Sequence, residues 1–434
     1  MKSYKGALIK EYEDNIFLYN PTVQSQSIIK KNGMSLEDAI KYNYNYLLEN
    51  MVLLDDYTNH GNIVDFFTNK EKFNFNNIII TEAMSFDCNL FCSYCMQQNT
   101  FKEVHTLAPE QRVNIWKNLI NIFNSKSISL HLFGGEPFYD INFVDRLLSN
   151  AINENIPISS IGAVTNGTIC NNSLIEIINK YNLSYLQITL DGNKNVHNIR
   201  RRSKTSFSSF DLIINNIEKF LKYTNCEIII NTVIDKSNYS NYKELVDFII
   251  DKFNVYVVGD NPRIIFNLGT ECHPVNKSDY TRDNVLSDED FNRMFYDNMD
   301  YLIQSNVIIN SILPTPMCIN DCVKDIIIGP NGDIYSCISG IGVDKFRICT
   351  YDEFINKPQL FLLESIKKSS SRKNDKCKVC DYTGMCNGGC YYNKVIENLD
   401  NSCQKSIFNN TIDRLLDCLV NVHEVSNGRY RKRS

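Results

Sequence analysis

Long apolar stretches are missing from this sequence. It contains no run of about 18 apolar residues, so we expect no membrane-spanning helix and no membrane partner. The first residues, "MKSYKGALIKEYEDN", contain neither an apolar signal core nor a cleavage-like stretch. We therefore expect the protein to be cytoplasmic.

An excess of positive charge is missing too. The formal net charge is -5 at pH 7 and the pI is ≈ 5.8, which gives no electrostatic reason to expect a nucleic-acid partner. Basic residues do gather near the end of the chain, within 426–434. We interpret that segment as a solvated basic tail.

Cysteine is absent before Cys88 and unevenly distributed after it. Of the 16 cysteines in 434 residues, three lie within 88–95 and ten lie between Cys318 and Cys418. A reducing cytoplasm disfavours disulfides, so we expect these cysteines to be metal ligands or catalytic thiols. Cys272, one of those between the two groups, is expected to be an ordinary buried thiol.

The length favours two or three domains, and a composition that is 43% apolar and 22% charged is typical of a globular protein. From the cysteine distribution and the apolar patterns we predict an N-terminal unit (1–72), an α/β domain (73–310), a cysteine-rich unit (311–425) and the tail. In the N-terminal unit, "KGALIKEY" and "NIFLYN" predict two strands. Ser35 followed by Asp38 predicts the start of a helix.

Strands alternate with helices from about residue 73 to 310. Buried strands are predicted at residues 76–84, 128–133, 158–164, 185–190, 227–234 and 263–268. The helix predicted in "APEQRVNIWKNLINIFN" has Pro109 near its start. This order favours a parallel sheet, either a partial barrel or a doubly wound layer, in which ligands bind at the carboxyl ends of the strands.

Glycine-rich or polar motifs follow the first four predicted strands. "CNLFCSYC" begins shortly after the first strand, "GGEP" follows the second, "TNG" the third and "DG" the fourth. Because the carboxyl ends of parallel strands share one rim, these motifs are expected to converge on one site.

The first motif, with cysteines at 88, 92 and 95, points to metal chemistry. Soft thiolates select zinc or iron–sulfur clusters, but a structural zinc site takes four ligands. A cubane cluster held by three cysteines leaves one iron open for a substrate or cofactor.

The motif Cys88-x3-Cys92-x2-Cys95, with Tyr94 before the third cysteine, resembles the signature of the radical S-adenosylmethionine enzymes. The resemblance implies a partial (β/α)6 TIM-like barrel in which the open iron of a [4Fe-4S] cluster binds S-adenosylmethionine. Reductive cleavage then gives a 5′-deoxyadenosyl radical that abstracts hydrogen from a substrate. An electron donor such as flavodoxin or ferredoxin is implied as well.

The other rim motifs are also similar to that family, in which the GGEP glutamate holds the cofactor's ammonium group. The segment "QITLDGNKNVHNIRR" is similar to the family's strand and loop beside the cofactor. The cofactor-binding residues implied by the resemblance are Tyr94, Gly134, Gly135, Glu136, Asn166, Asp191, Arg200 and Asn231. The sequence suggests no specific catalytic acid or base.

The C-terminal cysteines follow a second pattern, "CKVCDYTGMCNGGC", preceded by a predicted hairpin in "IIIGPNGDIYSC". The pattern resembles the SPASM extension of radical S-adenosylmethionine enzymes that modify peptides and proteins. The resemblance implies two auxiliary [4Fe-4S] clusters, and thus three clusters in all. The first would use Cys318, Cys322, Cys337 and Cys390, and the second Cys377, Cys380, Cys386 and Cys403. The close spacing of Cys318 and Cys322 leaves open whether both bind the first cluster.

The resemblance implies a maturase that modifies a ribosomally made precursor peptide through thioether or C–C links. The N-terminal unit would then hold the peptide's leader by strand addition, or act only as a packing cap. A sulfatase-type maturase that forms formylglycine is an alternative. That branch has an acidic residue after the cysteine that corresponds to Cys337, where this chain has Ile338. A zinc-stabilised protein-binding scaffold is the alternative of another class.

Overall fold

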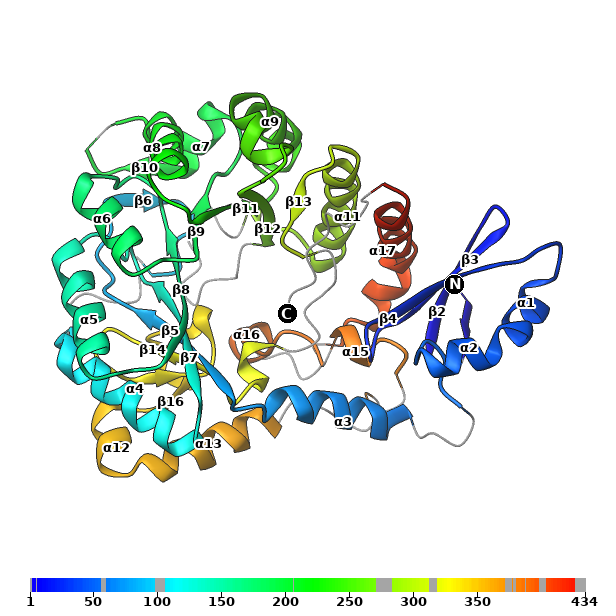
Figure 1. Ribbon diagram of the computed structural model, residues 1–434, viewed down its shortest axis with the longest axis horizontal. Coiled ribbons are helices and arrows are strands. Elements are labelled where there is room, and N and C mark those ends of the chain that lie inside the picture. Colours follow the sequence, from blue (N-terminus) through cyan, green and yellow to red (C-terminus); the bar gives the residue numbers. More distant parts are fainter. Residues whose placement is uncertain are drawn as a thin grey trace.

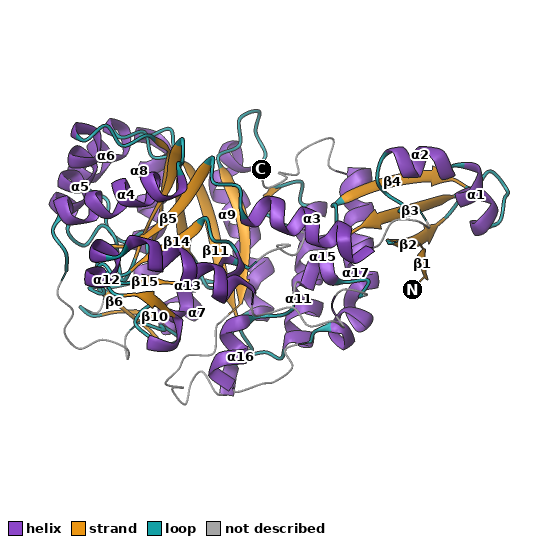
Figure 2. Cartoon of the chain, turned by 90° about the horizontal axis from the view of Figure 1, so that it is seen from below, coloured by secondary structure: helices purple, strands orange, loops and turns teal. Residues whose placement is uncertain are grey.

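The computed structural model describes residues 2–4, 6–55, 60–97, 106–205, 207–270, 283–311, 318–370, 377, 380–386, 388–397 and 403–425. The predicted basic tail and Cys272 lie outside these residues. A large α/β body occupies one end of the molecule and a small sheet with two helices occupies the other (Figures 1 and 2). Within the described residues, no helix is both long and apolar enough to cross a membrane.

The small body is the start of the chain. Its described strands form a four-stranded antiparallel sheet in sequence order. The strands are β1 (Lys2–Tyr4), β2 (Ala7–Tyr12), β3 (Asn15–Asn20) and β4 (Ser25–Lys30). The two predicted strands correspond to β2 and β3. The pattern "SQSIIK" of β4 is too weakly apolar at its start to predict a strand by itself.

Two short helices, α1 (Leu36–Tyr42) and α2 (Tyr44–Glu49), cover one face of this sheet. The Ser35 hydroxyl accepts a hydrogen bond from the Asp38 main-chain N–H at 3.2 Å, so the predicted helix start is confirmed. The other face contributes Leu8 and Phe17 to the main core. That face packs against the last helix, α17 (Lys405–Val425).

The main sheet has ten strands among the described residues, in the order β13-β12-β11-β9-β8-β7-β5-β14-β15-β16. Its parallel strands are β5 (Asn77–Ala83), β7 (Ser127–Phe133), β8 (Ile158–Thr165), β9 (Tyr185–Thr189), β11 (Glu227–Ile234), β12 (Ile264–Thr270), β13 (Ile308–Ile309) and β14 (Asp325–Ile328). All six predicted strands are present and parallel. The predicted α/β class is confirmed, and the curved sheet of Figure 1 is a partial barrel.

Helices cover the convex face of the sheet (Figure 1). They are α4 (Pro109–Phe123), α5 (Ile141–Asn153), α6 (Asn172–Lys180), α8 (Ser209–Tyr223), α9 (Tyr242–Val257) and α11 (Asp288–Gln304). Alternation within β7 shows the two faces: Ile128, Leu130 and Leu132 are fully buried under helices, while the residues between them are only half-buried. In β7 the inner face, with Ser127, Ser129 and His131, is therefore more polar and more exposed than the outer face.

The remaining helices and strands lie before, between or after the barrel elements in the chain. They are α3 (His60–Lys72), β6 (Leu90–Cys92), α7 (Lys194–Arg200), β10 (Arg201–Ser203), β15 (Ile334–Tyr335), β16 (Arg347–Cys349), α12 (Tyr351–Asn356), α13 (Pro358–Ser370), α15 (Thr383–Cys386) and α16 (Tyr391–Glu397). Short 3-10 helices are η1 (Tyr239–Asn241), η2 (Ile319–Asp321), η3 (Ile338–Gly340) and η4 (Asp344–Phe346). The predicted hairpin is β14–β15, and β14 pairs with β5, so the barrel sheet continues into the cysteine-rich segment.

A buried ion pair joins the outer face of β5 to that segment. The guanidinium of Arg112 binds the carboxylate of Glu82, and both side chains are fully buried. The indole N–H of Trp116 donates to the other carboxylate oxygen at 2.8 Å. Arg112 also donates to the carbonyl of Pro330 in the β14–β15 turn at 2.8 Å. One arginine therefore fixes the hairpin against the first barrel strand.

Candidate functional site

The three-cysteine loop leaves the carboxyl end of β5 and is fastened by a small ribbon. Its strand β6 pairs antiparallel with β10, which places Cys92 opposite Arg201. The Ser93 N–H donates to the Arg200 carbonyl at 2.8 Å, and the Lys204 N–H donates to the Asn89 carbonyl at 3.1 Å. The loop is thus tied at both ends to the segment that follows "DG".

The three thiols of the loop lie close to one another. Each of these cysteines is half-buried. Burial raises the pKa of Cys92 to about 12, Arg201 opposes this rise, and the thiols of Cys95 and Cys88 add to it. Thiols that disfavour each other's ionisation form a site that a cationic metal cluster would stabilise as thiolates.

The glycines of "GGEP" support this loop from below. The Gly135 N–H donates to the Ser85 carbonyl at 2.9 Å, and the Glu136 N–H donates to the Asp87 carbonyl at 2.8 Å. A Cβ at Gly134 would stand 2.4 Å from the Ser85 oxygen, and one at Gly135 would stand 2.3 Å from the Asp87 oxygen. Main chain can therefore approach main chain here only because both residues lack a side chain.

Glu136 lies beneath the rim and is 1% exposed. Burial raises the pKa of its carboxyl group, and three donors oppose that rise. The donors are the Asn166 N–H at 2.7 Å, the Thr165 hydroxyl at 2.7 Å and the Phe138 N–H at 3.1 Å. Glu136 therefore joins the end of β7 to the end of β8.

Asn166 links the third strand to the cysteine loop. Its Nδ2 donates to the Cys88 sulfur at 3.6 Å and to the Asn89 side-chain oxygen at 2.8 Å. Its Oδ1 accepts from the main-chain N–H of Thr168 at 2.8 Å. The sequence prediction thus placed Asn166 correctly at the rim, where it contacts a cysteine sulfur directly.

Tyr94 connects the loop to two charged residues. Its hydroxyl donates to the Asp191 carboxylate and accepts from Nη1 of Arg201 at 2.6 Å. The guanidinium of Arg200 lies over its ring, with Cζ 4.8 Å from the ring centroid. Burial raises the pKa of Tyr94, so its phenol stays protonated as a donor.

Asp191 and Arg200 face each other inside the protein, and at most 1% of either side chain is exposed. Arg200 Nε is 3.6 Å from Asp191, and Nη1 of Arg200 binds Asp235. Asp191 also accepts from the Val233 N–H at 3.1 Å. Asp191 thus connects Tyr94 to β11, and the charge of Arg200 is directed at Asp191 and Asp235.

Arg201 is the rim residue that sequence reasoning missed. Burial would lower its pKa, but Cys92, Tyr94 and Asp191 favour the charged guanidinium and raise the pKa overall. Its only sequence signal is the second arginine of "NIRR". The short β6–β10 ribbon that aims it at Cys92 has no apolar pattern long enough to predict.

Asn231 occupies the end of β11 on the inner face. It is 8% exposed, and its Oδ1 accepts from Asn267 Nδ2 at 2.7 Å. The structure therefore brings all eight predicted cofactor-binding residues to the rim or directly beneath it. All of them except Asn231 belong to the cysteine loop, contact it or hold a residue that contacts it; the Asn231 side chain instead contacts Asn267.

The C-terminal cysteines form two neighbourhoods. Cys337 is buried in an apolar cluster with Phe346 and Tyr392, and Cys390 packs against the same cluster. Cys380 and Cys386 instead pack against the main core. This division agrees with the two predicted ligand sets in these four positions.

The second neighbourhood contains Cys377 and Cys386, which interact. Burial raises the pKa of Cys386, the main-chain N–H groups of Gln404, Gly388 and Gly389 lower it, and Cys377 raises it again. Cys403 is exposed and directly precedes Gln404, whose N–H contacts Cys386. The three N–H groups partly offset the burial that raises the pKa of Cys386, and they point at its sulfur as donors to a bound thiolate would.

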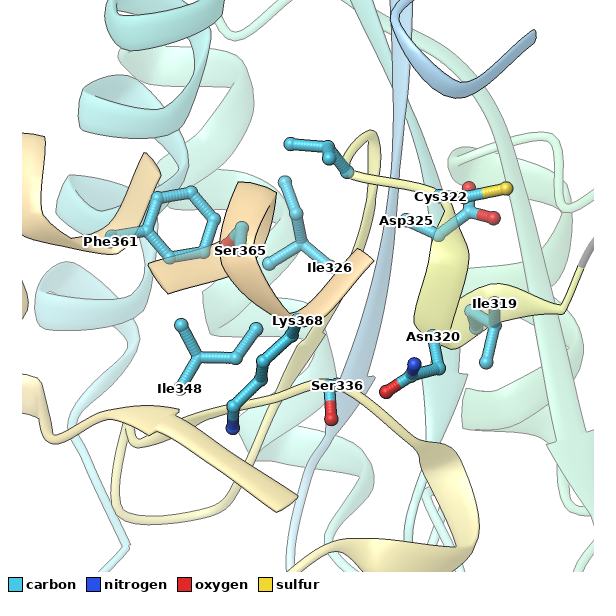
Figure 3. A pocket seen from close by; sticks show the side chains of 11 residues that line it. Ile319, Asn320, Cys322, Asp325, Ile326, Ser336, Ile348, Phe361, Ser365 and Lys368 are labelled. Carbon is cyan, nitrogen blue, oxygen red and sulfur yellow. The ribbon is translucent and has the colours of Figure 1, made fainter. Parts of the chain in front are cut away.

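The first neighbourhood adjoins a small cavity of about 10 Å³ behind Cys322 (Figure 3). Cys322 is buried, which raises the pKa of its thiol, and its neighbour Asp325 raises it further. Asn320, which lies between Cys318 and Cys322 in the sequence, also lines this cavity. The cavity has room for about one water molecule and is too small for a cofactor or substrate.

Across the described residues, no three His, Cys, Asp or Glu side chains converge as ligands of a single metal ion would. A cubane spreads its thiolates over separate irons, so its ligands need not converge in this way. The three mutually interacting thiols at 88, 92 and 95, with a buried cation beside them, fit such a cluster. Among the residues that the structure describes, neither neighbourhood of C-terminal cysteines brings three such side chains together.

Comparison with known proteins finds a family model that matches part of this chain and relatives that are similar along most of it. Residues 84–249 match the model of the Radical SAM superfamily. The cysteine-type anaerobic sulfatase-maturating enzyme of Clostridium novyi (strain NT) is 27% identical over 364 residues, which are 76% of this chain and 91% of that protein.

Two solved structures share the fold. Native anSMEcpe with bound AdoMet and Cp18Cys peptide has a TM-score of 0.62 at 19% identity, covering 80% of this chain and 99% of that one. Streptococcus suis SuiB bound to precursor peptide SuiA has a TM-score of 0.55 at 19% identity, covering 93% of this chain and 98% of that one.

Proposed function

We propose that this chain, which carries a radical SAM domain at residues 84–249, is a maturase that modifies a ribosomally made precursor peptide. The observation that carries the proposal is the three-cysteine loop, held at the carboxyl end of a parallel barrel between the "GGEP" turn and Arg201. Such a rim is where ligands of parallel α/β folds bind.

In this proposal Cys88, Cys92 and Cys95 hold one [4Fe-4S] cluster. Bound there, the cluster and S-adenosylmethionine supply the radical that abstracts hydrogen from the peptide. Arg201 provides a fixed positive charge next to Cys92, suited to the carboxylate of the cofactor. Glu136 and Asn166 hold the rim in shape through the hydrogen bonds described above. Asp191 and Arg200 act as positioning residues for Tyr94 and Arg201.

Eight of the ten C-terminal cysteines, the predicted ligands, would hold two auxiliary [4Fe-4S] clusters that accept the electron left on the substrate. The grouping of Cys337 with Cys390, and of Cys377 with Cys386, supports this assignment. A flavodoxin or ferredoxin would supply the reducing electron.

The N-terminal unit would bind the leader of the peptide. Its sheet ends at β4, which pairs on one side with β3 among the described residues. Tyr46 of α2 lies over this strand, with its hydroxyl 3.4 Å from the hydroxyl of Ser27. An extended leader could add to this edge as a further strand. SuiB, described with its precursor peptide SuiA, is matched along 93% of this chain.

A sulfatase-type maturase is the second candidate. The likeness to the Clostridium novyi enzyme along most of both chains favours it. Ile338 opposes it, because this apolar residue packs against the cluster around Cys337 where that branch has an acid. A peptide containing the sulfatase Cys or Ser would gain an aldehyde if this second function is correct.

The first test is anaerobic reconstitution of the wild type and of a variant with Cys88, Cys92 and Cys95 changed to alanine. About twelve irons in the wild type and about eight in the variant are expected, with 5′-deoxyadenosine formed only by the wild type. Zinc in place of iron, or no cleavage by the wild type, would instead support the scaffold alternative. A co-expressed precursor peptide should lose two hydrogens per link, measured by mass spectrometry.

A further inference from the structure

A row of carboxamide side chains follows the inner rim of the barrel. Asn231 on β11 lies opposite Thr189 of β9 on one side and Asn267 of β12 on the other. Asn310 follows β13, and its N–H donates to the Phe266 carbonyl at 2.9 Å. Asn166 follows Thr165, which lies opposite Ile188, so it stands at the same level as Thr189. We call Asn166, Asn231, Asn267 and Asn310 the asparagine belt.

Hydrogen bonds fix the orientation of the amides in this belt. Asn310 Nδ2 donates to Asn267 Oδ1 at 2.9 Å, and Asn267 Nδ2 donates to Asn231 Oδ1 at 2.7 Å. At the other end, Asn166 Nδ2 reaches the Cys88 sulfur. The belt thus runs from the cysteine loop to β13, the edge strand of the sheet.

Exposure increases along the belt. Asn166 is 4% exposed and Asn231 8%, whereas Asn267 and Asn310 are only half-buried. Each carboxamide has two N–H donors and two acceptor lone pairs. The hydrogen bonds to Asn231 and from Asn310 use one donor and one lone pair of Asn267, so one N–H and one lone pair of Asn267 remain. Spare donors and acceptors therefore face the inside of the barrel at its open end.

The level of the inner wall directly below the belt carries no charged side chain among the described residues. The next level below the belt consists of Val164, Gln187, Ile229, Ile265 and Ile308. A charged side chain that was pushed against these residues would lose its hydration without meeting an opposite charge. A main-chain amide, in contrast, has the donor and acceptor that a carboxamide matches.

We propose that Asn267 and Asn310 bind main-chain amides of the substrate, so that a neutral, extended segment of the peptide lies along the belt with its reacting residue toward Cys88. Asn231 positions Asn267 through their shared hydrogen bond. This inference rests on the proposed function. Neighbouring strands are about 4.8 Å apart, so three belt residues span roughly 10 Å, or about three extended peptide residues.

The test uses three capped pentapeptides and the wild-type protein reconstituted with its clusters and S-adenosylmethionine. The probes are Ac-Ala-Ala-Ser-Ala-Ala-NH2, its analogue with three N-methylated central amides, and the version with Asp in place of Ser. Binding is followed by ligand-observed NMR. The neutral parent should bind about 3–10-fold tighter than the N-methylated analogue, the range expected for one neutral hydrogen bond. The Asp version should bind more weakly than the parent.

Asn267→Leu and Asn310→Leu should each weaken binding of the parent peptide by a similar factor. In these variants the parent and the N-methylated peptide should bind equally. Asn267→Asp, which keeps the size of the side chain, should do the same if leucine disturbs folding. Asn114→Leu, on the exposed face of α4, is the matched control and should bind like the wild type.

Equal binding of the parent and the N-methylated peptide by the wild type, or no binding of the parent, would overturn the inference. Loss of S-adenosylmethionine binding in Asn267→Leu would also overturn it, because the belt would then serve the cofactor. Failure of the proposed function shows separately, as absence of 5′-deoxyadenosine from the wild type, and the binding comparison does not depend on cleavage.

Discussion

Replacing Gly135 with alanine should dislodge the three-cysteine loop. The added Cβ would stand 2.3 Å from the Asp87 carbonyl oxygen and 2.6 Å from that of Phe86. Both are main-chain atoms, so no rotamer change can relieve the contact. The segment leading to Cys88 must shift, and the 2.8 Å hydrogen bond from the Glu136 N–H to the Asp87 oxygen would weaken with it.

The size of the effect follows from these two contacts. Overpacking against a fixed neighbour costs about 1–3 kcal/mol, and the loss of one hydrogen bond adds about 1 kcal/mol. We therefore expect Gly135→Ala to lower the free energy of unfolding by about 2–4 kcal/mol. Gly269→Ala is the matched control, because its Cβ would meet no atom nearer than 3.5 Å.

The assay combines chemical unfolding of the cluster-free protein with iron analysis after reconstitution. Gly135→Ala should lose stability and bind about four irons fewer than the wild type, whereas Gly269→Ala should lose neither. If Gly135→Ala kept both its stability and its iron, the close approach of the two segments could not be what shapes the loop.

Three further predictions test the interior of the barrel. Arg112→Met leaves the buried carboxylate of Glu82 without its cation and should lower the free energy of unfolding by about 3–5 kcal/mol, measured by denaturant titration. Lys117→Met, which removes an exposed ion pair with Glu154, is the control and should lower it by less than about 1 kcal/mol. Burial holds the pKa of His197 well below its usual value, so below about pH 6.5 only the unfolded chain binds a proton at this residue. The free energy of unfolding of the wild type should therefore fall by up to about 1.4 kcal/mol per pH unit as the pH drops further, and that of His197→Asn should not show this contribution when unfolding is measured across the same range. Tyr94→Phe removes the hydroxyl that binds Asp191 and Arg201, and it should lower the free energy of unfolding by about 1–3 kcal/mol, measured by the same titration.

The sequence predicts the barrel strands because each is a short apolar run between turn residues. It also predicts where the rim motifs lie, since strand order fixes which ends are adjacent. Cys88 and Asn166, far apart in sequence, meet as that order requires. The cysteine and glycine motifs are short stretches of contiguous sequence, so their spacing can be recognised without knowledge of the fold.

Other features depend on long-range contacts that no local pattern encodes. The pairing of β14 with β5 joins residues 325–328 to 79–82, and nothing in either segment specifies its neighbour. The helix predicted after Ser35 is two helices that meet at Asn43, whose φ of -96° and ψ of 12° are not helical. Arg201 faces Cys92 only through the β6–β10 ribbon. Asp191 joins Tyr94, Arg200 and the Val233 N–H of β11, which come from separate segments of the chain, and no pattern around "DG" specifies those partners.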